Sequence, residues 1–291
     1  MAGPEEGFER LAPPRRGEWR SLFHEPPQSF DDYVARCANR RAPGRAAFLL
    51  QPLGAVAVRF PGTLARMAEY AAAFFGLEAR VLDPLPLPES AHVFPRDQHR
   101  SSGILSHLAD RAPADALVCL GITDQDLFAP GKKFVFGEAS LEGRTGVCSL
   151  ARLGGSDRRA LKLMTHEAGH ILSIAHCTAW RCVMQGSNTL KESDGHPLHL
   201  CPDDLRKLAW NTGVDLVSRY RALATLYSRL EWREDARWAK ERIANRESRI
   251  AGGRVPLALP RGETGGGTTL PRFPIPDSRF AIPRKAGASG A

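Results

Sequence analysis

The sequence predicts an α/β domain followed by a helical region. Two observations support this fold class. Short apolar runs alternate with amphipathic stretches of helix length between residues 45 and 157, which is typical of a sheet covered by helices. Residues 203–245 are instead almost continuously helical in pattern, with a break near Gly213. A hydrophobic content of 43% over 291 residues indicates a folded core rather than a disordered chain.

The strands and helices follow from these patterns in order. Strands are expected at residues 47–50, 79–82, 116–120, 134–137 and 146–150. A first helix is expected from Thr63 to Phe75, with Thr63 as its N-cap and Gly76 as its stop. A second helix is expected over residues 102–110, and a third from Asp157 to Ser173.

The last helical region carries an apolar stripe. Its members recur at spacings of four and three residues: Leu216, Tyr220, Leu223, Tyr227 and Leu230. This spacing places them on one helix face, and we expect that face to pack into the core.

The two ends differ from the centre. Residues 1–44 contain Pro13-Pro14 and Pro26-Pro27, which predict an irregular N-terminal extension wrapped loosely on the core. Residues 251–291 are rich in Gly, Pro and Arg, which predicts a disordered tail. The folded domain is therefore expected over residues 45–250.

Charge and composition exclude several classes of protein. The net charge is +8, but the arginines are spread along the chain and many lie near its ends, so we expect no specific nucleic-acid site. No apolar run approaches the roughly 20 residues that span a bilayer, and no signal peptide is evident. We expect a cytoplasmic protein with no membrane partner. The sequence does not indicate an oligomeric state.

A metal-binding pattern is the most informative feature. His166 and His170 are one turn apart on the predicted helix, so both imidazoles can bind one ion. Glu167 follows the first histidine and is directed at a metal-bound water rather than at the metal. His176 offers a third ligand, which leaves a fourth position open, as in a catalytic zinc site.

The cysteines fall into two groups. Cys177, Cys182 and Cys201 cluster around the metal pattern, and in a reducing compartment such a cluster binds metal more often than it forms disulfides. Cys37 and two others, Cys119 and Cys148, are scattered and are expected to be buried or partly buried thiols.

These residues resemble the archaemetzincins, a metzincin-like group of zinc metallopeptidases. The similarity lies in the run His166-Glu167-x-x-His170-x-x-Ser173-x-x-His176-Cys177, then Cys182, Met184 and Cys201-Pro202. Further similar blocks are residues 120–128, 134–139, 149–153 and 205–208, and the resemblance covers about residues 45–230. It implies a metzincin-like mixed sheet with an active-site helix, and a helical C-terminal subdomain.

The resemblance also implies chemistry. Zinc bound by His166, His170 and His176 would polarise a carbonyl and acidify its water, with Glu167 as general base. Met184 would lie beneath the metal. The expected activity is that of a peptidase or aminopeptidase on short peptides. A strand near residues 146–150 could border the cleft and accept a peptide as an added strand.

Two positions depart from the family pattern. Ser173 stands where the family has a Gly that allows a turn with positive φ, and a serine there costs on the order of 1 kcal/mol. Asp204 stands where the last of four zinc-binding cysteines is expected.

Asp204 could complete a second, structural zinc site with Cys177, Cys182 and Cys201, since carboxylate is an accepted zinc ligand. The alternatives are His199 or His196 as fourth ligand, Asp203 or Asp204 as a helix cap, and loss of the second zinc. The rival hypothesis for the whole protein is a catalytically impaired zinc-binding scaffold or interaction protein.

Overall fold

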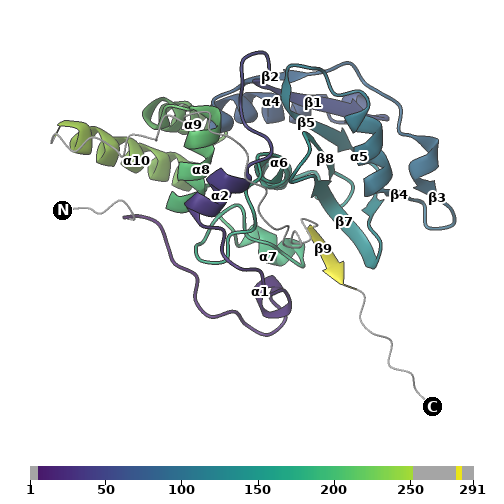
Figure 1. The fold of residues 1–291 in the computed structure, drawn as a ribbon, viewed down its shortest axis with the longest axis horizontal. Helices are drawn as coiled ribbons and strands as arrows, with labels where there is room; N and C mark the ends of the chain where they lie inside the picture. Colours follow the sequence, from purple (N-terminus) through teal and green to yellow (C-terminus); the bar gives the residue numbers. More distant parts are fainter. Residues whose placement is uncertain (1–5, 252–279, 284–291) are drawn as a thin grey trace.

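The computed structural model describes residues 6–251 and the backbone of residues 280–283. Its centre is a mixed sheet in the order β2-β1-β5-β8-β7-β6-β4-β3, with β9 paired to β7 (Figure 1). The strands are β1 (Ala47–Leu53), β2 (Glu78–Val81), β3 (His92–Val93), β4 (Gln98–Arg100), β5 (Ala116–Thr123), β6 (Leu127–Phe128), β7 (Lys132–Ala139), β8 (Thr145–Ser149) and β9 (Phe280–Pro283). The five strands expected from the sequence are therefore present, as are four short ones that were not expected.

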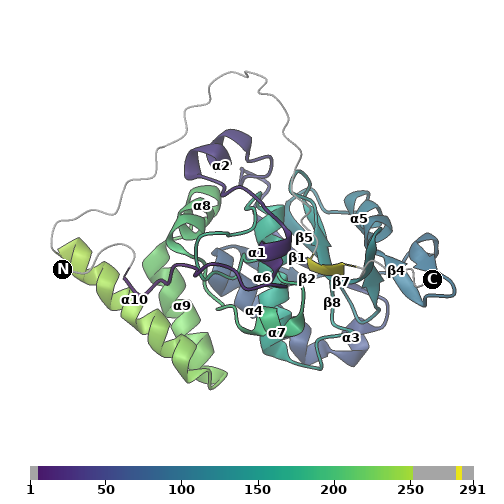
Figure 2. The same ribbon diagram turned by 90° about the horizontal axis from the view of Figure 1, so that it is seen from below.

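Helices cover both faces of this sheet. They are α1 (Trp19–Leu22), α2 (Phe30–Arg36), α3 (Val56–Arg59), α4 (Pro61–Phe75), α5 (Ser101–Ala109), α6 (Asp157–Ile171), α7 (Leu190–Asp194), α8 (Pro202–Thr212), α9 (Leu216–Arg229) and α10 (Arg233–Ala251), with a short 3₁₀ turn at Glu89–Ala91. α4 and α6 lie on one face and α5 on the other (Figure 2). The alternation of side chains along β1 produces this division, because Phe48 packs with α4 whereas Leu53 packs with Ile104 of α5.

The start of α4 differs from the prediction. The helix begins at Pro61, whose fixed φ suits the first helical position, so Phe60 rather than Thr63 occupies the N-cap. The Thr63 hydroxyl instead donates to Asp157 at 2.8 Å and links α4 to the start of α6. Gly76 ends α4 as expected, in the left-handed conformation with φ of 65°.

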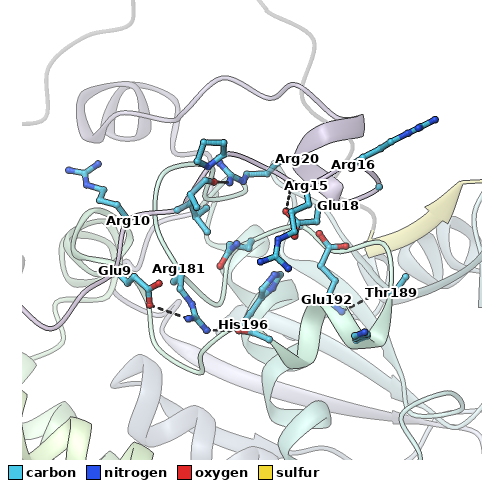
Figure 3. A pocket seen from close by; sticks show the side chains of 18 residues that line it. Glu9, Arg10, Arg15, Arg16, Glu18, Arg20, Arg181, Thr189, Glu192 and His196 are labelled. Atoms are coloured by element: carbon cyan, nitrogen blue, oxygen red, sulfur yellow. Dashed lines mark hydrogen bonds and ion pairs between the residues drawn. The ribbon is translucent and has the colours of Figure 1, made fainter.

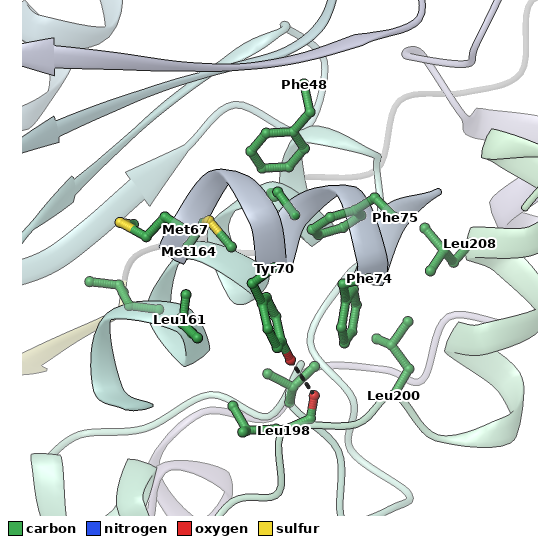
Figure 4. Packing of buried hydrophobic residues seen from close by; sticks show 14 of the residues in the cluster. Phe48, Met67, Tyr70, Phe74, Phe75, Leu161, Met164, Leu198, Leu200 and Leu208 are labelled. Carbon is green, nitrogen blue, oxygen red and sulfur yellow. Dashed lines mark hydrogen bonds between the residues drawn. The ribbon is translucent and has the colours of Figure 1, made fainter. Parts of the chain in front are cut away.

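The main hydrophobic core lies between α4, α6, β1 and the C-terminal helices (Figure 4). Phe48, Phe74 and Phe75 are almost completely buried there, and each such side chain stabilises the fold by about 1.5–3 kcal/mol. The Tyr70 hydroxyl lies 3.1 Å from the Tyr227 hydroxyl, so the polar ends of these buried rings are satisfied. The core therefore fixes α6, the helix with the metal-binding pattern, against both the sheet and the C-terminal region.

One break was expected in the C-terminal helical region. The structure has two breaks there, so the region consists of three helices. α8 ends at Gly213, with φ of 71°, as predicted. A second break separates α9 from α10 at Glu231, which has φ of 59° and whose residue type gives no turn signal. The apolar stripe of α9 packs into the core as expected, since Tyr220 and Leu223 are buried.

The N-terminal segment packs more closely than expected. It contains α1 and α2, and it buries Trp19, Tyr33 and Asn39 against the domain. Figure 1 shows this segment running along the side of the molecule that carries α6 and α7. The segment thus includes two short helices, and it packs tightly on the domain rather than loosely.

The expected disordered tail begins at residue 251. Residues 280–283 form β9, which runs antiparallel to β7. The remainder of the tail lies outside the described residues. Within the part of the chain that the structure describes, none of the helices combines the length and apolarity needed to cross a membrane.

Candidate metal centre and active site

Helix α6 carries the two histidines and the glutamate. Ser156 caps its start by accepting a hydrogen bond from the Arg159 amide, and the helix is buried from Ala160 to its end. His166 and His170 lie on one face, with their Nε2 atoms 3.1 Å apart. Two nitrogens bound to one tetrahedral zinc are separated by about 3.3 Å, so this spacing fits a shared ion.

The chain then makes the turn that the sequence left in question. Ser173 has φ of 65°, in the left-handed region that the family's glycine would occupy. Hydrogen bonds from the Ser173 amide to His170 and from the Ile174 amide to Gly169 close the helix end. The Ser173 hydroxyl also donates to the Leu141 carbonyl at 3.0 Å. The serine therefore adopts the strained conformation, and its hydroxyl makes a hydrogen bond that a glycine could not make.

This turn brings His176 to the other two histidines. The three imidazoles each offer one nitrogen within 4.8 Å of the others. The Nδ1 atoms of His166 and His170 donate to the carbonyls of Val183 and Ile174, at 3.0 and 2.8 Å, which directs both Nε2 atoms to the shared centre. Nε2 of His176 is buried without a hydrogen-bond partner among the described residues.

The electrostatics of the cluster suit metal binding. Burial lowers the pKa of His166 to about 3 and holds the pKa of His170 well below its usual range. His166 and His170 are therefore neutral near pH 7, which is the form that binds a metal. With His176 they bring three imidazole nitrogens together in a buried site, a donor set that fits zinc with one open position.

Glu167 lies beside the histidines but points toward the sheet. Its side chain is completely buried, and neither carboxylate oxygen has a hydrogen-bond partner in the described part of the chain. Burial first, and then the charge of Glu138, hold the pKa of Glu167 well above its usual range. The Cα of Gly137 in β7 faces this carboxylate so closely that an added Cβ would lie 2.6 Å from Oε1. Gly137 therefore provides the space that Glu167 occupies.

Met184 lies beneath the histidine pair. A Cβ added to Gly169 would overlap the Met184 sulfur, so the methionine packs directly on the helix backbone next to His170. The Met184 carbonyl also accepts a hydrogen bond from the Cys177 amide at 2.9 Å. This is the supporting position that the resemblance implied for the methionine.

A second cluster lies behind the third histidine. Cys177, Cys182, Cys201 and Asp204 offer ligand atoms within 4.8 Å of one another. The Sγ atoms of Cys177 and Cys201 are 3.7 Å apart, close to the roughly 3.8 Å expected for two thiolates on one tetrahedral zinc. Oδ2 of Asp204 lies 3.3 Å from the Sγ atoms of both Cys182 and Cys201. All six cysteines of the chain are free thiols.

The alternatives for the fourth ligand lie elsewhere. His199 stacks on Trp238 with ring centroids 4.1 Å apart, and His196 contacts the Ser187 hydroxyl. Neither aspartate caps α8, because the N-cap is Cys201, whose sulfur accepts the Asp204 amide. The structure thus brings Asp204 to the cysteines and leaves both histidines outside the cluster.

Asp204 is itself buried and paired. Its Oδ1 accepts a hydrogen bond from Lys207 at 2.8 Å, while Oδ2 faces the sulfurs. Burial raises the pKa of Asp204 to about 6, against the opposing charge of Lys207. The ammonium therefore stabilises the carboxylate in the ionised form that a metal requires.

The scattered cysteines are structural. Cys119 and Cys148 are buried in the sheet, and Cys37 is partly buried, as the sequence predicts. Burial raises the pKa of Cys119 to about 11, which keeps this thiol protonated.

Sequence reasoning missed the residues that the N-terminal segment adds to the site. Glu25 lies 2.9 Å from Nδ1 of His176, and the Trp19 ring packs 4.5 Å from the His176 ring, measured between centroids. Glu25 and His176 are 151 residues apart, so no local spacing could indicate this contact. Only the proline-rich irregularity of the segment was visible in the sequence.

Comparisons with known proteins agree with this geometry. The profile of Peptidase family M54 matches residues 103–209. The chain is 32% identical over 264 residues to Archaemetzincin-2 of Mus musculus, and the match covers 74% of each chain. It is 37% identical over 145 residues to an archaemetzincin of Methanocaldococcus jannaschii, covering 46% of this chain and 78% of that one. The solved structure of archaemetzincin from Methanopyrus kandleri is 29% identical with a TM-score of 0.53, and it covers 60% of this chain and 99% of that one.

Proposed function

Because this chain belongs to the archaemetzincins, zinc metallopeptidases of peptidase family M54, we propose that it hydrolyses short peptides at the three-histidine site. His166, His170 and His176 would hold the ion, and Glu167 would transfer the proton. When bound, zinc supplies Lewis-acid polarisation and acidifies water. The observation that carries the proposal is the convergence of three buried imidazoles beside the buried carboxylate of Glu167, which has no hydrogen-bond partner among the described residues.

Glu167 has the properties of a general base for this reaction. Its carboxylate makes no hydrogen bond to other described residues, so both oxygens remain available to accept a proton from water. Burial beside Gly137 fixes its position, and the same burial raises its pKa, which makes the carboxylate a stronger proton acceptor. Glu167 would then return the proton to the leaving amine.

The substrate is expected along β7 rather than β8. The sequence suggested that β8 could accept a peptide, but β8 lies between β5 and β7 and has no open edge. On the side away from β8, β7 pairs antiparallel with the short strand β9, with Gly137 opposite Phe280, so a peptide would take the place of β9 there. A peptide bound at this edge would pass the residue that faces Glu167.

We also propose that the cysteine cluster holds a structural zinc through Cys177, Cys182, Cys201 and Asp204. Their spacing supports four-coordinate binding, and the cluster joins the turn after His176 to the start of α8. Two observations support intact sites despite the departures that motivated the scaffold hypothesis. Ser173 has a φ of 65°, in the region a glycine would occupy, and Oδ2 of Asp204 lies 3.3 Å from the Sγ atoms of Cys182 and Cys201.

The test compares wild-type protein with Glu167→Gln. The amide keeps the size of the side chain but cannot accept the proton, so kcat should fall at least ~100-fold while zinc content stays the same. Free and N-acetylated peptides of the same sequence would show whether cleavage requires a free amino terminus, as in an aminopeptidase. Full activity of Glu167→Gln with bound zinc would exclude the proposed mechanism.

A further inference from the structure

The N-terminal segment lies along the end of α6 and the turn that follows it. Side chains from residues 28–39 bind consecutive backbone groups of residues 171–175. The contacts are Asn39 Nδ2 to the Ile171 carbonyl at 3.0 Å, Tyr33 hydroxyl to the Leu172 carbonyl at 2.9 Å, Gln28 Nε2 to the Ser173 carbonyl at 3.0 Å, and the Ala175 amide to Gln28 Oε1 at 3.1 Å. These groups would otherwise be left unpaired where the helix ends. The hydrogen bonds from this segment therefore stabilise the strained turn at Ser173.

Glu25 continues this series to the metal ligand itself. Its carboxylate can only accept a hydrogen bond, so Nδ1 of His176 carries the proton and donates it at 2.9 Å. The opposite nitrogen, Nε2, then carries a lone pair that can bind a metal, and it lies near the other two histidines. Both side chains are almost fully removed from solvent, with exposed fractions of 1% for His176 and 11% for Glu25.

The third histidine is held differently from the other two. Backbone carbonyls orient His166 and His170, and those carbonyls belong to residues of the same metal-binding region. His176 instead depends on a carboxylate, which carries a full negative charge and strengthens the imidazole as a ligand. The ring of Trp19 packs against the His176 ring at an angle of 59° and limits its rotation.

Further contacts fix the segment to the loop after His176. Arg20 donates to the Thr178 carbonyl at 3.1 Å, and the Trp19 amide donates to Glu192 at 2.7 Å. Figure 3 shows this region, including the ion pair between Arg181 and Glu9 at 3.1 Å. Glu9, Arg20, Arg181 and Glu192 border a cavity of about 700 Å³, which the histidines and cysteines of the two metal-binding clusters do not line. The N-terminal segment is therefore anchored on both sides of Glu25.

We propose that residues 25–39 form a positioning segment for the third zinc ligand, with Glu25 as the residue that orients His176 and strengthens its bond to zinc. The inference rests on the proposed three-histidine zinc site. The segment lies outside residues 103–209, which match the family profile. The complete metal centre of this chain thus requires residues that lie at least 64 positions before the region matched by the family profile, and Glu25 lies 151 positions before His176.

The test measures metal binding in the full chain with Glu25→Ala, Glu25→Gln and Asp31→Asn. Zinc affinity is measured by competition with a chelator, and cobalt(II) replaces zinc for absorption spectra. Glu25→Ala should weaken zinc binding at the histidines by about 10–100-fold and shift the cobalt d–d bands. Glu25→Gln should have a smaller effect, because its amide oxygen still accepts the hydrogen bond without the charge. Asp31→Asn removes the same charge from an exposed position of the same segment and should change nothing.

The cysteine cluster provides an internal control. Cobalt bound there gives thiolate charge-transfer absorption, which should remain the same in all variants. Unchanged affinity and d–d bands in Glu25→Ala would overturn the role of Glu25 while leaving the proposed function intact. Equal loss of both cobalt signals in Glu25→Gln would also overturn it, because Glu25 would then support the fold as a whole. Wild-type protein that binds no metal at the histidines would contradict both proposals.

Discussion

Gly137 provides a test of the position of Glu167. The glycine lies in β7 with an ordinary negative φ, so alanine is compatible with its backbone and the effect of Gly137→Ala is steric. The new Cβ would lie 2.6 Å from Oε1 and 2.8 Å from Cδ and Cγ of Glu167. Ordinary contacts of this kind begin at 3.4 Å. The carboxylate must therefore move by about 0.8 Å, or the strand must move by the same amount.

The expected loss follows from this displacement. A misplacement of about 1 Å at a reacting group costs roughly 100-fold in rate, so kcat of Gly137→Ala should fall by about that factor. Crowding of a packed interior should also lower the free energy of unfolding by about 1–3 kcal/mol. Zinc content should remain unchanged, because none of the histidines is among the atoms nearest to the added Cβ.

Gly146→Ala is the matched control. Gly146 lies in the neighbouring strand β8, and its added Cβ would crowd two apolar side chains, Leu120 of β5 at 2.9 Å and Ile171 of α6 at 3.0 Å. It should lose stability to a similar degree while keeping much more of its activity. The assay is kcat on a fluorogenic peptide, together with thermal unfolding and zinc analysis. Equal losses of kcat in the two variants would refute the assignment of Gly137 as the residue that positions Glu167.

Three further predictions concern the metals and the substrate edge. Changing His166 and His170 together to alanine should remove about one equivalent of zinc, and unchanged zinc content would contradict the assignment. At the second site Asp204→Cys should bind zinc more tightly and raise the melting temperature, because thiolate suits zinc better than carboxylate. Asp204→Ala should lower both quantities, and an unchanged metal content would remove Asp204 from the ligand set. Ending the chain after Ala251 removes β9 from the edge of β7, so KM for a peptide should fall; unchanged kinetics would show that β9 does not compete with substrate.

The chemistry of the candidate site was predictable because it depends on local spacing. His166 and His170 are four residues apart, and helix geometry alone places them on one face. The positive φ at Ser173 was foreseeable from the resemblance, because the family has a glycine at this position. The apolar stripe of α9 was predictable for a similar reason, because apolar residues that recur about every 3.6 positions lie on one face of a helix.

The errors arose where two distant segments determine a local feature. Thr63 has the side chain of an N-cap, but Pro61 begins α4 earlier and Asp157 binds the Thr63 hydroxyl. β8 has the sequence of a strand, yet sequence does not give the order of strands in a sheet, and β8 lies inside it.

The sequence by itself determined the metal-binding helix, the ligand types and the α/β class, because these depend on periodicity and on the chemistry of single side chains. Only the tertiary structure decided which residues complete and support the site. Asp204 rather than His199 meets the cysteines, Gly137 makes room for Glu167, and Glu25 binds His176. Each of these pairs joins residues from different elements, and the packing of a shared core, rather than any spacing along the chain, brings them within a few ångströms.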